Sequence, residues 1–295
     1  MPLTPVPEMA RRAREGGYAI GYFESWNFES LYGVVEAAEE SRSPIIIGFN
    51  GEFLSRAERI APERLSWYGA LGREAAIGAN VPCGFIFNEC ADDDWTRAAV
   101  TAGFNLVMPA DAAAPHDAYV RRVREIVDYA HPRGVAVEAE VGELPSGIPG
   151  FSHGKAGKTD PEMARAFVQT TGVDLLAVSV GNVHVLLSGR RELDLDHLKA
   201  LRRAVDIPFV LHGGTGIADE SLREAIGMGV AKVNYGTVLK QAYLATVRTA
   251  LAADEPNPHA LLGMGGPEDV MVAGRKAVRE AVLERLPALG CAGRA

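Results

Sequence analysis

The sequence predicts an α/β fold, a closed (β/α)8 barrel that forms a single domain over residues 1–295 and carries a C-terminal helical extension. Eight short apolar runs each precede an amphipathic helical pattern. The runs are apolar throughout rather than alternating, which indicates parallel strands buried on both faces. Eight such units in 295 residues favour a closed barrel over an open sheet. No G-x-G-x-x-G motif follows the first run, which argues against a dinucleotide-binding open sheet.

The elements follow one another in regular order along the chain. The predicted strands are 18–23, 45–49, 84–87, 105–108, 135–139, 175–179, 209–211 and 232–234. The predicted helices are 28–40, 61–79, 95–102, 118–130, 161–171, 195–204, 219–228 and 237–251. A last amphipathic segment, 267–286, is expected to pack outside the barrel or against a neighbouring subunit. We expect a homodimer or homotetramer.

Composition and charge limit the classes of partner. Hydrophobic residues make up 47% of the chain and the formal net charge is −8. No cluster of Lys and Arg is longer than a pair, so we expect no nucleic-acid partner. An acidic protein can still bind an anionic substrate, because a helix N-terminus attracts phosphate locally.

The spacing of the cysteines and the lack of a recognisable targeting signal predict a cytoplasmic location. Cys83, Cys90 and Cys291 have neither disulfide nor metal-site spacing, which fits a reducing compartment. The N-terminus has no apolar signal-peptide core. No apolar run reaches the roughly 18 residues that a membrane span needs, so we expect no membrane partner.

Two histidines are expected at the mouth of the barrel, where barrel active sites lie. His184 follows the sixth predicted strand and His212 follows the seventh. Glu24, Glu89 and Glu140 come at the ends of other strands. Two imidazoles with a nearby carboxylate predict a divalent-metal site with an open position, although a histidine at a strand end is more often structural.

Two glycine-containing motifs predict an anion site beside the histidines. "HGGTG" follows the seventh strand and "NYGT" follows the eighth, and each leads into a helix. Adjacent glycines let backbone N–H groups approach an anion closely. Barrels build phosphate sites from these two loops, although glycines in such positions also serve simply as tight turns.

With these motifs in view, the chain resembles the class II, metal-dependent fructose-bisphosphate and tagatose-bisphosphate aldolases. The resemblance covers nearly the whole chain and is most specific in "GVDLLAVSVGNVH" and "DIPFVLHGGTGI". It implies a lyase that binds a phosphorylated keto substrate. It also implies a divalent-metal cofactor, with zinc as the first expectation and manganese, cobalt, iron or magnesium as competitors.

The resemblance also implies roles for individual residues. His184 and His212 match two of the family's three metal-binding histidines, and Glu140 matches a glutamate beside the metal. The matching substrate- and phosphate-binding positions are Gly181, Gly213, Gly214, Thr215, Asn234 and Thr237.

The chain departs from the family at its third strand. The family's catalytic aspartate is replaced by Asn88, and its third metal histidine is replaced by Glu89. An amide is neither a general acid nor a general base near neutral pH, so Asn88 cannot inherit the aspartate's role. The family's asparagine after the first strand is replaced by Glu24, and the acidic pair of its mobile loop falls on Gly147 and Ile148.

These departures leave three interpretations open. In the first, Glu89 is a metal ligand and Glu24 or Glu140 moves the proton. In the second, Glu89 is the general base and Glu140 completes the metal site. In the third, the site has decayed. The leading function is a divergent lyase, and the alternatives are a non-catalytic homologue that acts as a binding module and a metal-dependent isomerase or epimerase. His153, Lys155 and Lys158, in the long loop after the fifth strand, are candidates for a lid over the substrate, and the alternative is a solvated loop with incidental charges.

Overall fold

The computed structural model describes residues 3–111, 114–142, 145, 157–252 and 254–295. Its strands are β1 (Ile20–Ser25), β2 (Ile45–Asn50), β3 (Cys83–Cys90), β4 (Leu106–Pro109), β5 (Ala136–Val141), β6 (Leu175–Val178), β7 (Phe209–Leu211) and β8 (Val230–Tyr235). Each strand pairs in parallel with the next, and β1 also pairs with β8, which closes the barrel. The predicted (β/α)8 barrel is confirmed, and every predicted strand overlaps an observed one.

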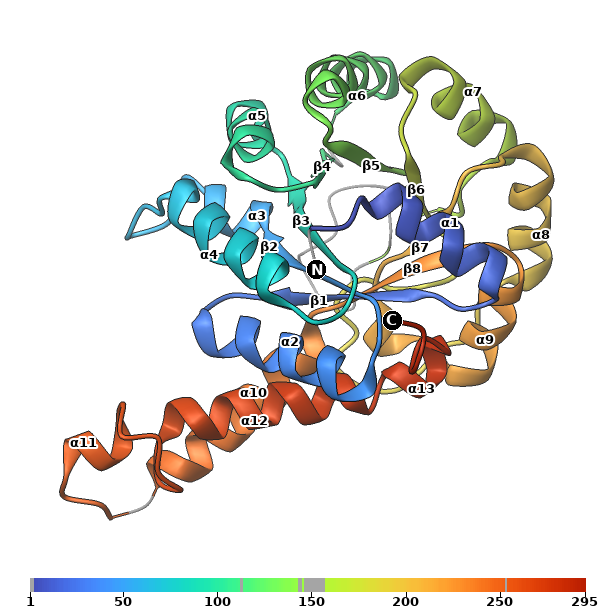
Figure 1. Ribbon diagram of the computed structural model, residues 1–295. Helices are drawn as coiled ribbons and strands as arrows, with labels where there is room; N and C mark the ends of the chain where they lie inside the picture. Colours follow the sequence, from blue (N-terminus) through green and yellow to red (C-terminus); the bar gives the residue numbers. More distant parts are fainter. Residues whose placement is uncertain (1–2, 112–113, 143–144, 146–156, 253) are drawn as a thin grey trace.

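Helices surround the barrel, as Figure 1 shows. They are α1 (Val6–Gly16), α2 (Phe28–Ser41), α3 (Gly51–Ser55), α4 (Leu65–Gly78), α5 (Asp93–Ala102), α6 (His116–Ala130), α7 (Pro161–Thr171), α8 (Leu195–Ala204), α9 (Asp219–Gly227), α10 (Thr237–Leu251), α11 (Pro258–Leu261), α12 (Val270–Leu283) and α13 (Leu286–Leu289). Two 3₁₀ turns, His131–Arg133 and Gly214–Gly216, complete the set in the described residues. All eight predicted helices overlap observed ones, whereas α1, α3, α11 and α13 had no predicted counterpart.

Helix starts in the chain have identifiable caps. The side chain of Asn27 accepts a hydrogen bond from the backbone of Ser30, and Ser30 caps Asn27 in return. Asp92 and Asp160 accept bonds at the starts of α5 and α7. Such caps satisfy the N–H groups that the first helical turn leaves free.

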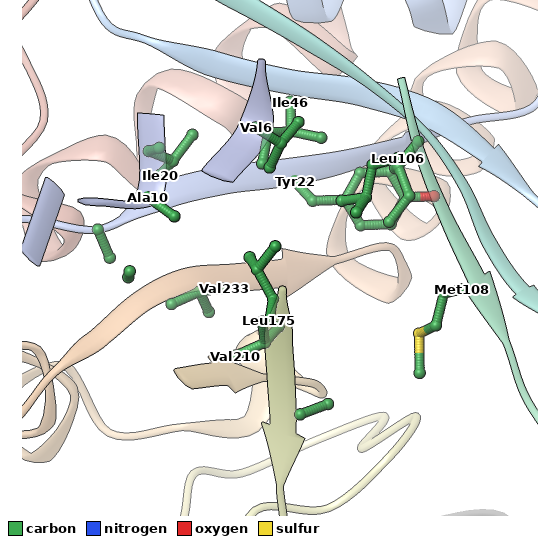
Figure 2. Packing of buried hydrophobic residues seen from close by; sticks show 14 of the residues in the cluster. Val6, Ala10, Ile20, Tyr22, Ile46, Leu106, Met108, Leu175, Val210 and Val233 are labelled. Atoms are coloured by element: carbon green, nitrogen blue, oxygen red, sulfur yellow. The ribbon is translucent and has the colours of Figure 1, made fainter. Parts of the chain in front are cut away.

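The N-terminal helix covers the end of the barrel away from the predicted site. Val6 and Ala10 of α1 are fully buried against the strands, next to Ile20 and Ile46 (Figure 2). Gly84 permits this approach, because a Cβ there would lie 2.6 Å from Cγ2 of Val6. The core therefore fills one end of the barrel and leaves polar residues for the other.

The largest error in a predicted strand boundary lies at the end of the third strand. The prediction ended the third strand at Phe87, but β3 continues through Asn88 and Glu89 to Cys90. Asn88 pairs with Asn50 of β2, and Cys90 pairs with Pro109 of β4 after a register shift. Polar residues can extend this strand because their backbones still find ladder partners.

The C-terminal part of the chain forms a helical arm, which we define as α10, α11 and α12. In Figure 1 the arm projects from the barrel, with α11 at its far end. The predicted segment 267–286 corresponds to α12, which packs against α10 and α2. Nε of Arg275 donates to Glu36 of α2 at 2.6 Å, which ties the arm to the barrel. Within the described ranges, no helix has the length and apolar character to cross a membrane.

Candidate metal centre and substrate cavity

Three side chains from different strands converge at the carboxyl end of the barrel. Glu89 lies on β3, His184 follows β6 and His212 follows β7. Oε1 of Glu89 is 2.8 Å from Nδ1 of His212 and 3.4 Å from Nε2 of His184. One ligand atom of each residue lies within 4.8 Å of the other two. Glu140 is not part of this group, so the geometry favours Glu89 as the third ligand.

Glu89 reaches the cavity because the backbone of β3 is irregular at this residue. Consecutive residues of a regular strand point to opposite faces, yet Asn88 and Glu89 both line one cavity. Glu89 has a left-handed φ of 53°, and the pairing of β3 with β4 shifts between Phe87 and Cys90. A bulge of this kind re-aims a side chain, and bulges are common next to active sites.

A second layer of polar groups orients two members of the triad. Nδ2 of Asn50 donates to Oε2 of Glu89 at 2.8 Å. Nε2 of His212 lies 3.1 Å from Oε1 of Glu138, and Nζ of Lys232 lies 2.9 Å from Oε2 of the same carboxylate. Metal-binding histidines typically donate their other ring nitrogen to a carboxylate in this way.

The sequence analysis did not identify Asn50 or Lys232. The available signals were an asparagine directly after the predicted strand 45–49 and a lysine inside the apolar run "VAKVNY". Both signals are weak, because they gain meaning only when the neighbouring strands are known.

Electrostatic coupling in the triad is strong. Burial alone would raise the pKa of Glu89, but the imidazoles of His184 and His212 hold that pKa well below its usual range. Burial would lower the pKa of His212, but the Glu138 and Glu89 carboxylates raise it to about 10. The two carboxylates therefore favour the protonated form of the His212 imidazole.

The donor set fits a divalent cation. Nδ1 of His212 is buried and close to Glu89 but makes no hydrogen bond of acceptable geometry. A nitrogen and a carboxylate oxygen that face each other in this way resemble two ligands around an ion. Two imidazoles and one carboxylate suit zinc and other first-row metals. The side chain of His184 is 39% exposed, which leaves room for an open coordination position.

Two members of the triad, Glu89 and His184, border a cavity of about 280 Å³. Its polar lining includes Tyr22, Glu24, Asn50, Asn88, Glu89, His184, Gly213, Thr215, Asn234, Thr237 and Lys240. Phe53, Leu186, Leu187 and Leu244 form an apolar part of the wall. The cavity therefore joins the candidate metal ligands to the predicted anion site.

The predicted anion-binding residues do not all reach this cavity. Gly213, Thr215, Asn234 and Thr237 line it, whereas Gly181 and Gly214 do not. A Cβ at Gly181 would meet the backbone of Glu192. Gly181 has a φ of 100° and lies beside the segment 192–194, so its substrate-binding role stays a prediction.

Gly214 also has a packing role rather than a place in the cavity. A Cβ at this position would lie 2.7 Å from Cγ1 of Val233, against β8. The absent side chain lets the loop after β7 rest on that strand. Gly213 has a φ of 69°, which a glycine adopts without strain.

The first turn of α10 borders the cavity, and within the described residues the N–H of Thr237 makes no hydrogen bond, whereas the N–H groups of Val238 and Leu239 do. Its N-cap residue, Gly236, supplies no side-chain hydrogen bond. Oγ1 of Thr215 accepts from the backbone of Val238 at 3.3 Å, which joins the loop after β7 to this turn. Nδ2 of Asn234 is buried and has no hydrogen-bond partner. A helix N-terminus with free donors attracts anions.

Glu24 occupies space that Gly236 leaves open. A Cβ at Gly236 would lie 2.3 Å from Oε2 of Glu24. Oε1 of Glu24 accepts from Nζ of Lys240 at 2.5 Å. Burial raises the pKa of Glu24, although the Lys240 ammonium opposes that shift. The carboxylate of Glu24 is thus held at the edge of the anion site by the helix that forms it.

Asn88 and Glu140 offer different chemistry. Asn88 is only 3% exposed, and its Oδ1 has no hydrogen-bond partner. Burial raises the pKa of Glu140 to about 7, and its Oε1 is also without a partner. Glu140 is not part of the cavity lining. Gly147, Ile148, His153 and Lys155 lie outside the described residues.

These features define a (β/α)8 barrel with a candidate metal centre next to the predicted anion site. The family model for class II fructose-bisphosphate aldolase matches residues 4–294. The chain therefore belongs to the class II fructose-bisphosphate aldolase family.

Individual relatives cover almost the whole chain. Fructose-bisphosphate aldolase of Geobacillus stearothermophilus is 31% identical over 302 residues, covering 100% of this chain and 99% of the relative. The crystal structure of the YdjI aldolase from Escherichia coli K12 has a TM-score of 0.81 at 33% identity, covering 99% of each chain. A putative fructose-1,6-bisphosphate aldolase from Coccidioides immitis has a TM-score of 0.82 at 25% identity, covering 99% of this chain and 98% of the other.

Proposed function

We propose that the protein is a divergent metal-dependent aldolase. It cleaves or forms a carbon–carbon bond in a phosphorylated ketose or related keto compound by way of an enediolate. The observation that carries this proposal is the convergence of Glu89, His184 and His212 near the cavity that the N-terminus of α10 also lines. Membership of an aldolase family supports the same conclusion.

In this proposal Glu89, His184 and His212 hold a divalent cation, with zinc first among the candidates. A cation held there polarises the substrate carbonyl as a Lewis acid. Asn50 keeps Glu89 in the orientation that binding requires, because its amide donates a hydrogen bond to the Glu89 carboxylate. Glu138 does the same for His212, because its carboxylate accepts from the imidazole.

The phosphate of the substrate binds at the loops after β7 and β8. Backbone groups of Gly213 and Thr237, the hydroxyl of Thr215 and the amide of Asn234 surround this part of the cavity. Helix α10 has 15 residues, so its N-terminus carries the full partial positive charge of a helix end.

Because the Asn88 amide cannot transfer the proton, a carboxylate elsewhere in the site has to do so. Glu24 lines the cavity and is held by Lys240. Glu140 has a pKa of about 7, close to the value that suits a general acid or base at neutral pH. Replacing Glu24 and Glu140 separately by Gln identifies the carrier, because only the residue that moves the proton lowers kcat with little change in KM.

A panel experiment tests the proposal. Purified protein is analysed for metal and then incubated with ketose phosphates, and release of a triose phosphate is followed with a coupled dehydrogenase. We expect stoichiometric metal and cleavage of at least one substrate. Protein that carries no metal and takes none up contradicts the metal-dependent mechanism.

Asn88 favours one alternative, a metal-dependent isomerase or epimerase. Shifting a proton next to a carbonyl forms the same enediolate but needs no base at the C4 hydroxyl, where an amide cannot act. Products from the same panel separate the two functions. An unchanged carbon skeleton for every substrate that reacts favours the isomerase.

A further inference from the structure

We propose that Lys232 is a positioning residue that couples the metal centre to the substrate-binding amide. Its buried ammonium holds Glu138 in place for His212 and, through a separate hydrogen bond, turns the amide of Asn234 toward the cavity. This inference rests on the proposed function, because it concerns the metal and phosphate sites named there.

The first arm of the coupling runs to the metal centre. Nζ of Lys232 lies 2.9 and 3.1 Å from the two carboxylate oxygens of Glu138, and both side chains are fully buried. Oε1 of Glu138 lies 3.1 Å from Nε2 of His212. When Nε2 carries the proton, Nδ1 is free to bind a metal beside Glu89. Without Lys232, the buried Glu138 carboxylate would lack a countercharge and would not keep this geometry.

The second arm runs to the substrate site. Lys232 donates to Oδ1 of Asn234 at 2.6 Å. An ammonium can only donate hydrogen bonds, so it must face the oxygen of the amide and not the nitrogen. The NH₂ group of Asn234 is therefore turned the other way. It is buried without a partner in a residue that lines the cavity, ready to donate to a phosphate or hydroxyl oxygen.

The position of Lys232 on β8 makes both arms possible. Lys232 and Asn234 are two residues apart on one strand, so their side chains share a face. The Tyr22 ring lies 5.2 Å from the ammonium, on β1, the strand that closes the barrel against β8. The Lys232 ammonium lies between the barrel core and the cavity, and it contacts both the Glu138 carboxylate and the Asn234 amide.

Binding measurements on the full-length protein test the coupling. Zn²⁺ affinity is measured by competition with a chelator, and dihydroxyacetone phosphate affinity is measured by calorimetry at saturating Zn²⁺. We expect Lys232→Met to weaken both. The loss of Zn²⁺ affinity should be about 10–100-fold, the usual effect of removing an outer-layer partner of a metal ligand.

Single-arm variants show whether the effect passes through the named residues. Glu138→Gln should weaken Zn²⁺ binding and leave ligand affinity close to wild type. Asn234→Ala should weaken ligand binding and leave Zn²⁺ affinity close to wild type. Lys199→Met is the matched control, since Lys199 lies on the surface of α8, and it should change neither affinity.

A double variant guards against misfolding. Lys232→Met combined with Glu138→Gln leaves no unpaired buried charge at this pair of residues, and thermal unfolding checks that it is folded. We expect it to lose ligand affinity that Glu138→Gln alone retains. Folded variants without Lys232 that keep either affinity at the wild-type value overturn the coupling. Wild-type protein that binds neither Zn²⁺ nor the triose phosphate overturns the proposed function as well.

Discussion

At the scale of single residues, the geometry of Glu89 was predictable only in part from the sequence. Its meeting with His184 and His212 was predictable, because barrel strands present their carboxyl ends at one mouth. Its left-handed backbone was not predictable, since glutamate is unfavourable in that conformation and no local motif marks it. Val185 adopts the same conformation directly after His184.

The triad gives a first prediction about metal uptake. His212→Ala removes a ligand that contacts both Glu89 and Glu138, so the variant should take up no stoichiometric metal. Cys90→Ala should bind metal like the wild type, because the Cys90 thiol approaches Ser55 and the backbone of Asp92 instead. Elemental analysis after dialysis against Zn²⁺ checks both. Full metal content in His212→Ala would place the ion elsewhere.

Asn88 gives a second prediction about catalysis. Asn88→Asp restores a carboxylate in the cavity, so cleavage of fructose or tagatose bisphosphate should rise by up to about 100-fold, within the usual range for one proton-transfer group. Asn88→Ala is the control and should show no gain. Steady-state kinetics measures the effect. An equally fast wild type would mean that Glu24 or Glu140 already supplies the proton efficiently.

At the scale of elements, the start of α10 combines two functions. The start of this helix at a glycine beside the cavity was predictable from "NYGT". The use of the same glycine to accommodate Glu24 was not predictable, because β1 and β8 are far apart in sequence and adjacent only in the closed barrel.

Gly236 gives a third prediction at this scale. Gly236→Ala puts a methyl group where Oε2 of Glu24 lies, and a flexible carboxylate can move away. We therefore expect a change of about 1 kcal/mol or less in the free energy of unfolding. Substrate affinity should fall, because the displaced carboxylate and Lys240 disturb the anion site. Chemical denaturation measures the change in unfolding free energy, and KM reports the change in substrate affinity. Gly227→Ala, with open space around it, is the control.

At the scale of the whole molecule, the barrel was predictable because buried parallel strands have a recognisable pattern. Helix α1 also has a helical pattern, with buried Val6, Met9, Ala10 and Ala13 on one stripe. The sequence does not reveal which surface such a stripe covers. That the stripe faces the far end of the barrel depends on strands that are assembled from the entire chain.

The helical arm gives a fourth prediction, that of a homodimer or homotetramer. Leu251, Leu262 and Met264 are exposed on the arm or beside α11. Light scattering should give two or four times the 31.5 kDa chain mass. Leu251→Glu with Leu262→Glu should reduce that mass, whereas Ile60→Glu, at an exposed position between α3 and α4, should not. A wild-type mass of 31.5 kDa contradicts this prediction.

The contact between Glu24 and Gly236 also constrains how this sequence can have evolved. The present position of the Glu24 carboxylate is sterically incompatible with any side chain at residue 236. A lineage that gained the glutamate first would have had to hold it in another rotamer. Loss of the side chain at 236 is therefore the expected earlier step. Homologous sequences should show a glutamate at position 24 mainly where position 236 is glycine. The two positions should therefore covary despite the 200 or so residues between them.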